Sequence, residues 1–353
     1  MRILLTGGAG FIGSNLVHYL LGPGGREAGC VIDLVVNLDK LTYAGNPENL
    51  AAVAGDSRHL FVHGDICDAE LVRRLLTENR IDAIMHLAAE SHVDRSIDSP
   101  GDFIQTNFVG TFRLLEAARA HAKNRDGFRF LHVSTDEVYG ALGPADPAFC
   151  ETTPYAPNSP YSASKAGSDF LVRAYLHTYG LDVVTTNCSN NYGPFQFPEK
   201  LVPLIIRKIM RGETLPVYGD GMQVRDWLFV EDHCRGLLAS LLRGRAGETY
   251  CIGGRSEKPN IEVVRTLIRI VTERLPARDR KRPEELISHV KDRPGHDRRY
   301  AIDCSKIERE FGWRPQETFE TGMTRTVDWY FANQSWVEHI ERGTYGGERL
   351  GVG

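Results

Sequence analysis

Two residues one helical turn apart are the first candidates for chemistry in this chain. Tyr161 and Lys165 are spaced Tyr-x-x-x-Lys, which puts a phenol and an ammonium on the same face of a helix. A charged lysine at this separation can lower the pKa of the tyrosine, so that the phenolate acts as a base toward a sugar or alcohol hydroxyl. The spacing therefore predicts oxidation of an alcohol, although an ordinary helix pair is the alternative.

A second motif, Thr135-Asp136-Glu137, directly follows the apolar run Phe130–Ser134. Simple alcohol oxidation has no need for two adjacent carboxyls. An enzyme that also removes a proton and expels a hydroxyl needs one acid and one base. Taken alone, the pair would better fit an exposed acidic turn, but its place between a strand and Tyr161 favours a catalytic role.

A glycine motif near the N-terminus predicts a dinucleotide site. Gly7, Gly10 and Gly13 follow the first expected strand with the spacing Gly-x-x-Gly-x-x-Gly. The first allows a tight turn, the second lets a pyrophosphate approach, and the third allows close helix–sheet packing, with the helix N-terminus facing the phosphates. A plain glycine turn is the alternative, but the strand and helix lie where this motif requires them.

Carboxylates and small residues at the following strand ends extend this site. Asp39 can accept hydrogen bonds from the adenosine ribose and repel a 2′-phosphate, which favours NAD over NADP despite the neighbouring Lys40; a turn aspartate is the alternative. Asp65 is either an adenine contact or a loop residue. The predicted cofactor-binding residues are Gly7, Gly10, Phe11, Ile12, Gly13, Asp39, Lys40, Leu41, Thr42, Asp65, Ile66, Leu87, Ala88, Ala89, Ser91, Thr106, Tyr161, Lys165 and Asn191.

The elements that must position these residues alternate between β-branched or apolar runs and amphipathic segments. This pattern predicts an α/β fold, a Rossmann-type doubly wound parallel sheet with a smaller C-terminal α/β lobe that binds substrate. Strands are expected at Arg2–Thr6, Ile32–Leu38, Leu60–His63, Ala83–Leu87, Phe130–Ser134 and Val183–Asn187. Helices are expected at Phe11–Leu21, Ala69–Asn79, Asp102–His121, Pro160–Tyr179, Leu201–Arg211, Glu231–Leu242 and Phe319–Asn333.

Proline and glycine become frequent after about Asn190, which suggests a domain boundary there. We expect residues 1–190 to bind NAD and carry part of the catalytic site. Residues 191–335 should form mainly the substrate-binding lobe, interleaved with the first domain, and residues 336–353 a tail. Gly22–Ala28 is expected to be a loop, and the charge-rich Arg274–Glu285 a surface excursion.

The composition excludes several classes of protein. The 353 residues are 42% hydrophobic and 25% charged, with a net charge of −4, so no basic field for nucleic acid or a membrane surface is present. The seven cysteines are scattered without a Cys-x-x-Cys pair, which indicates neither a disulfide framework nor a metal site. With no signal peptide and no long apolar run, the sequence predicts a cytoplasmic protein.

Together these residues resemble the extended short-chain dehydrogenase/reductase superfamily and, within it, the dTDP-glucose 4,6-dehydratases. The resemblance runs from Met1 to about Asn333. Its more discriminating piece is Thr135-Asp136-Glu137, because the related sugar-nucleotide epimerases lack the Asp-Glu pair. The rivals are a 4-epimerase or decarboxylase acting on a UDP-sugar and, in another class, a catalytically silent NAD-sensing protein.

The resemblance implies an NAD-dependent lyase that converts dTDP-glucose to dTDP-4-keto-6-deoxyglucose, for rhamnose or another deoxysugar. Tyr161, Lys165 and Thr135 would act at the 4-hydroxyl, Glu137 would remove the C5 hydrogen, and Asp136 would protonate the departing 6-hydroxyl. The implied substrate-binding residues are Ser91, Thr135, Asn190, Lys200, Leu201, Pro216, Tyr218, Arg225, Asn260, Arg293, His296 and Tyr300. The family also implies a homodimer, paired through the helices expected at Asp102–His121 and Pro160–Tyr179.

Overall fold

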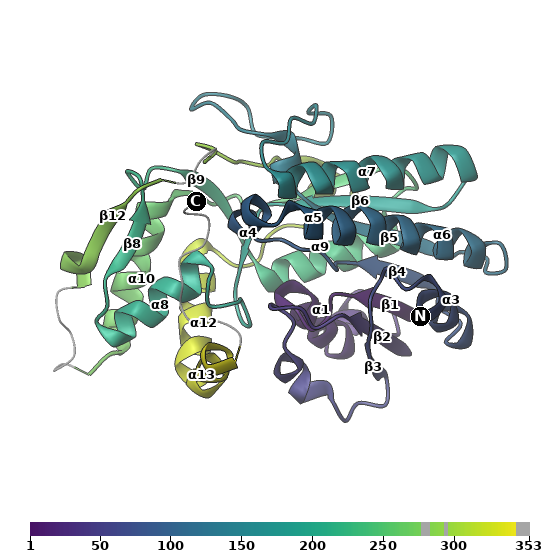
Figure 1. The fold of residues 1–353 in the computed structure, drawn as a ribbon, viewed down its shortest axis with the longest axis horizontal. Coiled ribbons are helices and arrows are strands. Elements are labelled where there is room, and N and C mark those ends of the chain that lie inside the picture. Colours follow the sequence, from purple (N-terminus) through teal and green to yellow (C-terminus); the bar gives the residue numbers. More distant parts are fainter. Residues whose placement is uncertain (277–282, 293–295, 344–353) are drawn as a thin grey trace.

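The computed structural model of the chain describes residues 1–276, 283–292 and 296–343. Within this range, seven parallel strands form a sheet in the order β10-β6-β5-β4-β1-β2-β3 (Figure 1). The order reverses between β1 and β4, and in doubly wound sheets the crevice beyond the strand ends at such a point is where ligands bind. The strands are β1 (Arg2–Thr6), β2 (Leu34–Asp39), β3 (His59–His63), β4 (Ala83–His86), β5 (Arg129–Thr135), β6 (Val183–Cys188) and β10 (Thr249–Ile252).

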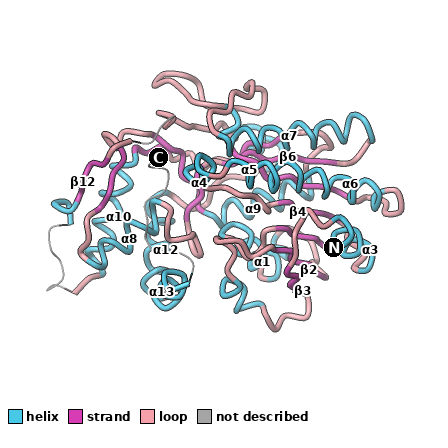
Figure 2. Tube along the Cα trace, in the orientation of Figure 1, coloured by secondary structure: helices cyan, strands magenta, loops and turns pink. Residues whose placement is uncertain are grey.

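Helices cover both faces of this sheet (Figure 2). Ile3 and Leu5 of β1 pack with α1 (Phe11–Leu21), α9 (Val230–Arg243) and α11 (Ser305–Phe311), whereas Leu4 belongs to the core on the opposite face. This alternation arises because successive strand residues point to opposite sides. The helices of the opposite face are α3 (Ala69–Glu78), α6 (Thr111–Ala122) and α7 (Pro160–Tyr179). The expected α/β doubly wound fold is therefore confirmed.

A smaller lobe lies at one end of the main sheet and has its own hydrophobic core (Figure 1). Its described strands form two small sheets, β11-β9-β7 and β12-β8. The chain returns from this lobe to the main sheet for α9 and β10, so the two lobes are interleaved. The elements of the smaller lobe are β7 (Asn190–Tyr192), α8 (Leu201–Arg211), β8 (Leu215–Tyr218), β9 (Val224–Phe229), β11 (Glu257–Pro259), α10 (Asn260–Arg274), β12 (Ile287–Val290) and α12 (Phe319–Ala332).

Two expectations for the first 190 residues were wrong in detail. The helix expected at Asp102–His121 is divided into α5 (Pro100–Phe103), the π-helical segment η2 (Ile104–Gly110) and α6. The wide turn of η2 directs Asn107 inward, where its side chain bonds both the N–H and the C=O of Glu90. Gly22–Ala28 contains a short helix, α2 (Gly24–Glu27), because the absence of a side chain at Gly24 lets it pack on the Tyr19 ring.

The other short helices among the described residues include η1 (Pro47–Val53), α4 (Val93–Asp98), η3 (Asp136–Tyr139) and η5 (Pro283–Leu286).

The segment expected as a tail begins with a packed helix, α13 (Gln334–Gly343), whereas residues 344–353 lie outside the described range. The Trp336 ring is 6% exposed and lies 5.0 Å from the Trp329 ring. Its Nε1 donates a hydrogen bond of 2.8 Å to Asn49 Oδ1. The helix therefore links the smaller lobe to η1. Of the expected excursion Arg274–Glu285, residues 277–282 also lie outside the described range. Among the described helices, none has the length and apolar content needed to span a bilayer.

We expect Trp336→Ala to lower the free energy of unfolding by about 3–5 kcal/mol, because it deletes a large buried side chain and leaves Asn49 without its donor. Urea unfolding followed by far-UV circular dichroism measures the change. Glu338→Ala on the same helix, at a side chain that is 52% exposed, is the control and should stay within about 0.5 kcal/mol of the wild type. Equal unfolding midpoints for all three proteins would show that α13 does not stabilise the fold.

Candidate active site

One cleft receives the carboxyl ends of β1, β2, β4 and β5, together with the first turns of α1 and α7 and the segment from Cys188 to Lys200. Catalytic and cofactor-binding candidates that are far apart in the sequence meet here. The predicted residues that line the cleft are Gly7, Gly10, Phe11, Ile12, Gly13, Asp39, Lys40, Thr42, Asp65, Ile66, Leu87, Ala88, Ala89, Ser91, Thr106, Thr135, Asp136, Glu137, Tyr161, Lys165, Asn190, Asn191 and Lys200.

The glycine loop between β1 and α1 forms one wall of the cleft. Gly7 has a φ of +78°, and a Cβ there would lie 2.8 Å from the backbone of Ala88. A Cβ at Gly13 would lie 2.1 Å from the carbonyl oxygen of Gly7, so Gly13 packs closely against the loop rather than against the sheet as expected. In the described chain, no side chain caps α1 at Gly10. The first amide groups of α1 are therefore suited to a phosphate anion.

The carboxylate of Asp39 both stabilises a turn and lines the cleft. Its Oδ2 accepts a hydrogen bond of 2.8 Å from the Ala9 amide, and its Oδ1 accepts one of the same length from Leu41. Burial raises the pKa of Asp39 from its usual value. Lys40 Nζ lies 2.8 Å from Asp65 Oδ2, so the Asp65 carboxylate balances the positive charge of Lys40. That positive charge was the one feature of this loop that weakened the preference for NAD over NADP. The loop and the carboxylate together fit a dinucleotide.

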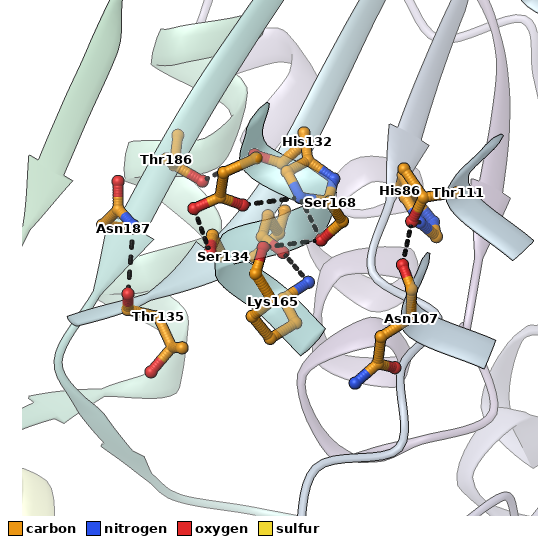
Figure 3. Close-up of polar contacts among 12 residues, drawn as sticks. His86, Asn107, Thr111, His132, Ser134, Thr135, Lys165, Ser168, Thr186 and Asn187 are labelled. Carbon is orange, nitrogen blue, oxygen red and sulfur yellow. Dashed lines mark hydrogen bonds and ion pairs between the residues drawn. The ribbon is translucent and has the colours of Figure 1, made fainter. Parts of the chain in front are cut away.

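Tyr161 and Lys165 lie on the first turns of α7, which begins with a capping box formed by Ser159 and Ser162. Lys165 Nζ donates a hydrogen bond of 2.8 Å to the Val133 carbonyl of β5 (Figure 3). Burial lowers the pKa of Lys165.

The sequence led us to expect a lowered pKa for Tyr161, but the net effect of the groups that the protein itself supplies is in the opposite direction. Burial of the phenol and the charge of Glu137 raise the pKa of Tyr161 well above its usual value, although a hydrogen bond with Thr135 acts in the opposite direction. Desolvation of the phenolate therefore raises the pKa of Tyr161 by more than the hydrogen bond with Thr135 lowers it.

Asp136 and Glu137 lie in different environments although they are adjacent in sequence. Thr135 ends β5 and caps η3, where its Oγ1 accepts a hydrogen bond of 3.3 Å from the Glu137 amide. Asp136 is buried, and its Oδ2 has no hydrogen-bond partner among the described residues. Burial, followed by the charges of Glu137 and Asp226, raises the pKa of Asp136 well above its usual value. Asp136 is thus suited to carry a proton toward a ligand.

Most of the predicted substrate residues of the smaller lobe lie outside the lining of this cleft. The Arg225 guanidinium lies 4.2 Å from the centre of the Tyr300 ring and donates to the Val224 and Asp297 carbonyls. The charge of Arg225 acts on Asp136, and the charge of Glu137 raises the pKa of Tyr300. Arg225 and Tyr300 are therefore within electrostatic range of Asp136 and Glu137, respectively.

A second contact joins Tyr218 and His296, whose ring centres are 6.1 Å apart. Asn260 begins α10, and its Oδ1 is buried without a partner in the described chain. Pro216 lies on β8 and Leu201 begins α8. Leu41, with a φ of +53°, donates to Asp39 and is not part of the lining. Arg293 lies outside the described residues.

Sequence reasoning missed a group of polar side chains in the lining of the cleft. Tyr43, Glu90 and Glu199 line it, and Glu199 lies 3.3 Å from the Arg95 guanidinium, which lies 3.7 Å from the centre of the Tyr43 ring. Tyr43 and Glu199 adjoin residues that were predicted, Thr42 and Lys200, but no spacing rule joins segments more than a hundred residues apart. No group of three or more metal-binding side chains occurs in the part of the chain described.

Comparison with known proteins identifies the family. The family model for GDP-mannose 4,6 dehydratase matches residues 4–326. A dTDP-glucose 4,6-dehydratase of Xanthomonas campestris is 60% identical over 99% of this chain and 98% of its own length. One from Neisseria meningitidis is 57% identical over 100% and 99%. The chain belongs to the dTDP-glucose 4,6-dehydratases.

Solved structures agree with this dehydratase family. The dTDP-glucose 4,6-dehydratase of Streptomyces venezuelae, solved with NAD and TDP bound, is 50% identical and covers 96% of this chain and 100% of its own, with a TM-score of 0.88. A UDP-glucose 4-epimerase of Thermotoga maritima is 29% identical with a TM-score of 0.81, covering 95% of this chain and 100% of its own. The fold is thus shared with epimerases, and the higher sequence identity distinguishes the dehydratases.

We expect Gly13→Ala to weaken NAD binding by about tenfold or more, because the new methyl group must displace the glycine loop that faces the cleft. Calorimetric titration of the protein, stripped of nucleotide, with NAD measures the affinity. Gly55→Ala is the matched control, since a Cβ there would have nothing within 4 Å. Unchanged NAD affinity in Gly13→Ala would contradict a cofactor site at this loop.

Proposed function

We propose that this dehydratase is an NAD-dependent hydro-lyase that converts dTDP-glucose to dTDP-4-keto-6-deoxyglucose. The relatives named for dTDP-glucose, and the related structure solved with NAD and TDP, support both the substrate and the cofactor. The observation that carries the proposal is Asp136, a buried carboxyl with an unpartnered oxygen in the cleft. Alcohol oxidation alone gives such a group no task, whereas elimination of a hydroxyl requires an acid.

The first part of the reaction is oxidation at C4. NAD, when bound, would supply the acceptor for the hydride that leaves C4 and the donor for the hydride that C6 receives. Tyr161 takes the proton of the 4-hydroxyl, and Thr135 hydrogen-bonds the same oxygen. Because burial and Glu137 raise the pKa of Tyr161, the ammonium of Lys165 is needed to stabilise the phenolate.

The second part is elimination of water across C5 and C6. The new 4-keto group acidifies the C5 hydrogen, which Glu137 removes as a proton. Asp136, kept protonated by burial and by its acidic neighbours, gives its proton to the departing 6-hydroxyl. A proton then adds to C5 as hydride adds to C6, so the reaction is redox-neutral.

The division of the chain proposed here follows the two lobes. Residues 1–190 hold NAD, with Asp39 on the ribose. Residues 191–335 hold the nucleotide sugar, where Arg225, together with Arg293, is suited to a diphosphate. Arg225 is already buried over Tyr300, which supports a fixed rather than a mobile guanidinium.

We propose a homodimer formed through η2, α6 and α7, which contact one another. Large apolar side chains are exposed there: Ile104 at 49%, Phe170 at 58% and Phe108 at 37%, with Phe108 against Gly167. A cytoplasmic location and supply of rhamnose or another deoxysugar belong to the same proposal. The absence of disulfides among the seven cysteines supports that location.

Purified protein with bound NAD should convert dTDP-glucose to a product that has lost one water, without added reductant. Mass spectrometry follows the product. An unchanged mass with inverted C4 would indicate a 4-epimerase, and loss of carbon dioxide from a UDP-uronate would indicate a decarboxylase. Unreacted dTDP-glucose on NAD-loaded protein would refute the proposed activity.

Asp136→Asn and Glu137→Gln should each lower turnover by about 10²–10⁴-fold, since each removes one partner of the acid–base pair. Affinity for NAD should stay within about twofold, because both substitutions are isosteric. Reduced nicotinamide should accumulate during turnover, since oxidation at C4 precedes the blocked step. Absorbance of the reduced cofactor and product formation report the two stages. Wild-type turnover in both variants would contradict the assigned roles.

Phe170→Lys should convert the dimer to a monomer at micromolar concentration, because it buries a charge in the proposed apolar contact. Sedimentation velocity measures the change. Val31→Lys is the control, since Val31 is 73% exposed but lies outside η2, α6 and α7. If the wild type sediments as a monomer, or if both variants remain dimeric, the proposed interface is wrong.

A further inference from the structure

Asp169 is a buried carboxylate that no step of the proposed reaction uses. It lies on α7 one turn beyond Lys165, and its side chain is 4% exposed. Three donors satisfy it: Ser134 Oγ at 2.8 Å, His132 Nε2 at 2.9 Å and the Tyr155 hydroxyl at 2.9 Å. Two of these donors belong to β5, the strand that ends in Thr135. A neutral side chain could also join a helix to a strand, so the burial of a carboxylate here requires an explanation.

The histidine beside Asp169 does not neutralise it. His132 directs Nε2 toward Asp169, while its Nδ1 is buried and has no partner in the described part of the chain. An imidazolium would leave an N–H at Nδ1 unsatisfied, whereas the neutral ring with the proton on Nε2 donates to Asp169 and leaves only a weak acceptor. Burial, and then the charge of Lys165, lower the pKa of His132. The neutral His132 ring therefore donates to Asp169 without adding a positive charge beside it.

Among the described residues, the titratable neighbours of Lys165 on the sheet side include His86 and His132, which Figure 3 labels, and Cys188. His86 on β4, like His132 on β5, is buried with a lowered pKa. Cys188 on β6 has its pKa raised to about 12, so it is a neutral thiol near pH 7. On the cleft side lie Tyr161, Asp136 and Glu137, the groups that the reaction itself titrates. Among the neighbouring charges, Asp169 contributes most toward keeping Lys165 protonated.

We propose that Asp169 is a positioning residue: it supplies the fixed countercharge that keeps the ammonium of Lys165 protonated and, through Ser134 and His132, holds α7 in register with β5. The inference rests on the proposed role of Lys165 in the dehydratase reaction. Acting through Lys165, Asp169 keeps the same charge while the substrate, Tyr161 and the carboxyl pair exchange protons. Burial of an ammonium is costly, and an anion one helical turn away offsets that cost.

The pH dependence of the oxidation step tests this role. In Asp169→Asn, loss of the anion disfavours the ammonium form of Lys165. The alkaline limb of the pH–rate profile, where activity falls as the pH rises, should therefore move to lower pH by about one unit or more. The readout is the single-turnover rate of cofactor reduction by dTDP-glucose on NAD-loaded protein. Asp169→Glu keeps the charge and should restore the wild-type alkaline limb even if the rate falls. Tyr155→Phe removes one hydrogen bond to Asp169 but no charge, so it should leave the limb within about 0.3 units.

A double-mutant cycle on thermal stability gives a second, independent measurement. Lys165→Met leaves the Asp169 carboxylate without its countercharge, so Asp169→Asn should lower the Tm by less in the Lys165→Met background than in the wild-type background. An additive loss of Tm, or an alkaline limb that does not move in Asp169→Asn, would overturn the proposal. If the wild type does not turn over dTDP-glucose, the proposed function is wrong. The double-mutant cycle would still show whether Asp169 is the countercharge of Lys165, because it measures stability and not activity.

Discussion

Burial of charge at the junction of β5 and α7 is the constraint on which the site depends. Lys165 is buried and donates to the Val133 carbonyl, and Asp136 and Tyr161 are buried as well. An isolated charge in such surroundings is costly, so every group here either pairs with another or changes its protonation state. Burial raises the pKa of Asp136, which favours a proton on its carboxyl. Burial also raises the pKa of Tyr161, which makes its phenolate harder to form. In the proposed reaction, Tyr161 and Lys165 are therefore both needed to form the phenolate.

The interleaving of the two lobes places this junction next to the lobe that we expect to bind the substrate. The chain leaves the main sheet after β6, builds the smaller lobe, returns for α9 and β10, and ends in α12 and α13. Asp226 of β9 accepts hydrogen bonds from the Gly254 and Ser256 amides and also acts on Asp136. The electrostatics of the catalytic pair are thus set partly by the lobe that we expect to bind the sugar nucleotide.

Cofactor and chemistry are separated along the sheet. The glycine loop and Asp39 lie at the ends of β1 and β2, whereas Thr135 ends β5 on the other side of β4. Epimerases share the sheet at a TM-score near 0.8, so the scaffold is compatible with more than one reaction. Within this site, the two carboxyls that follow β5 differ in burial: Asp136 is buried and Glu137 is partly exposed.

The sequence by itself determined the local features: the glycine loop, the Tyr-x-x-x-Lys helix and the approximate positions of six strands along the chain, because each depends on residues close along the chain. Only the tertiary structure decided the protonation of Asp136, the raised pKa of Tyr161, the packing of α13 through Trp336 and the contact of Asp169 with β5. These depend on burial and on neighbours from distant segments. Desolvation and charge act through space, and no spacing in the sequence records which segments meet.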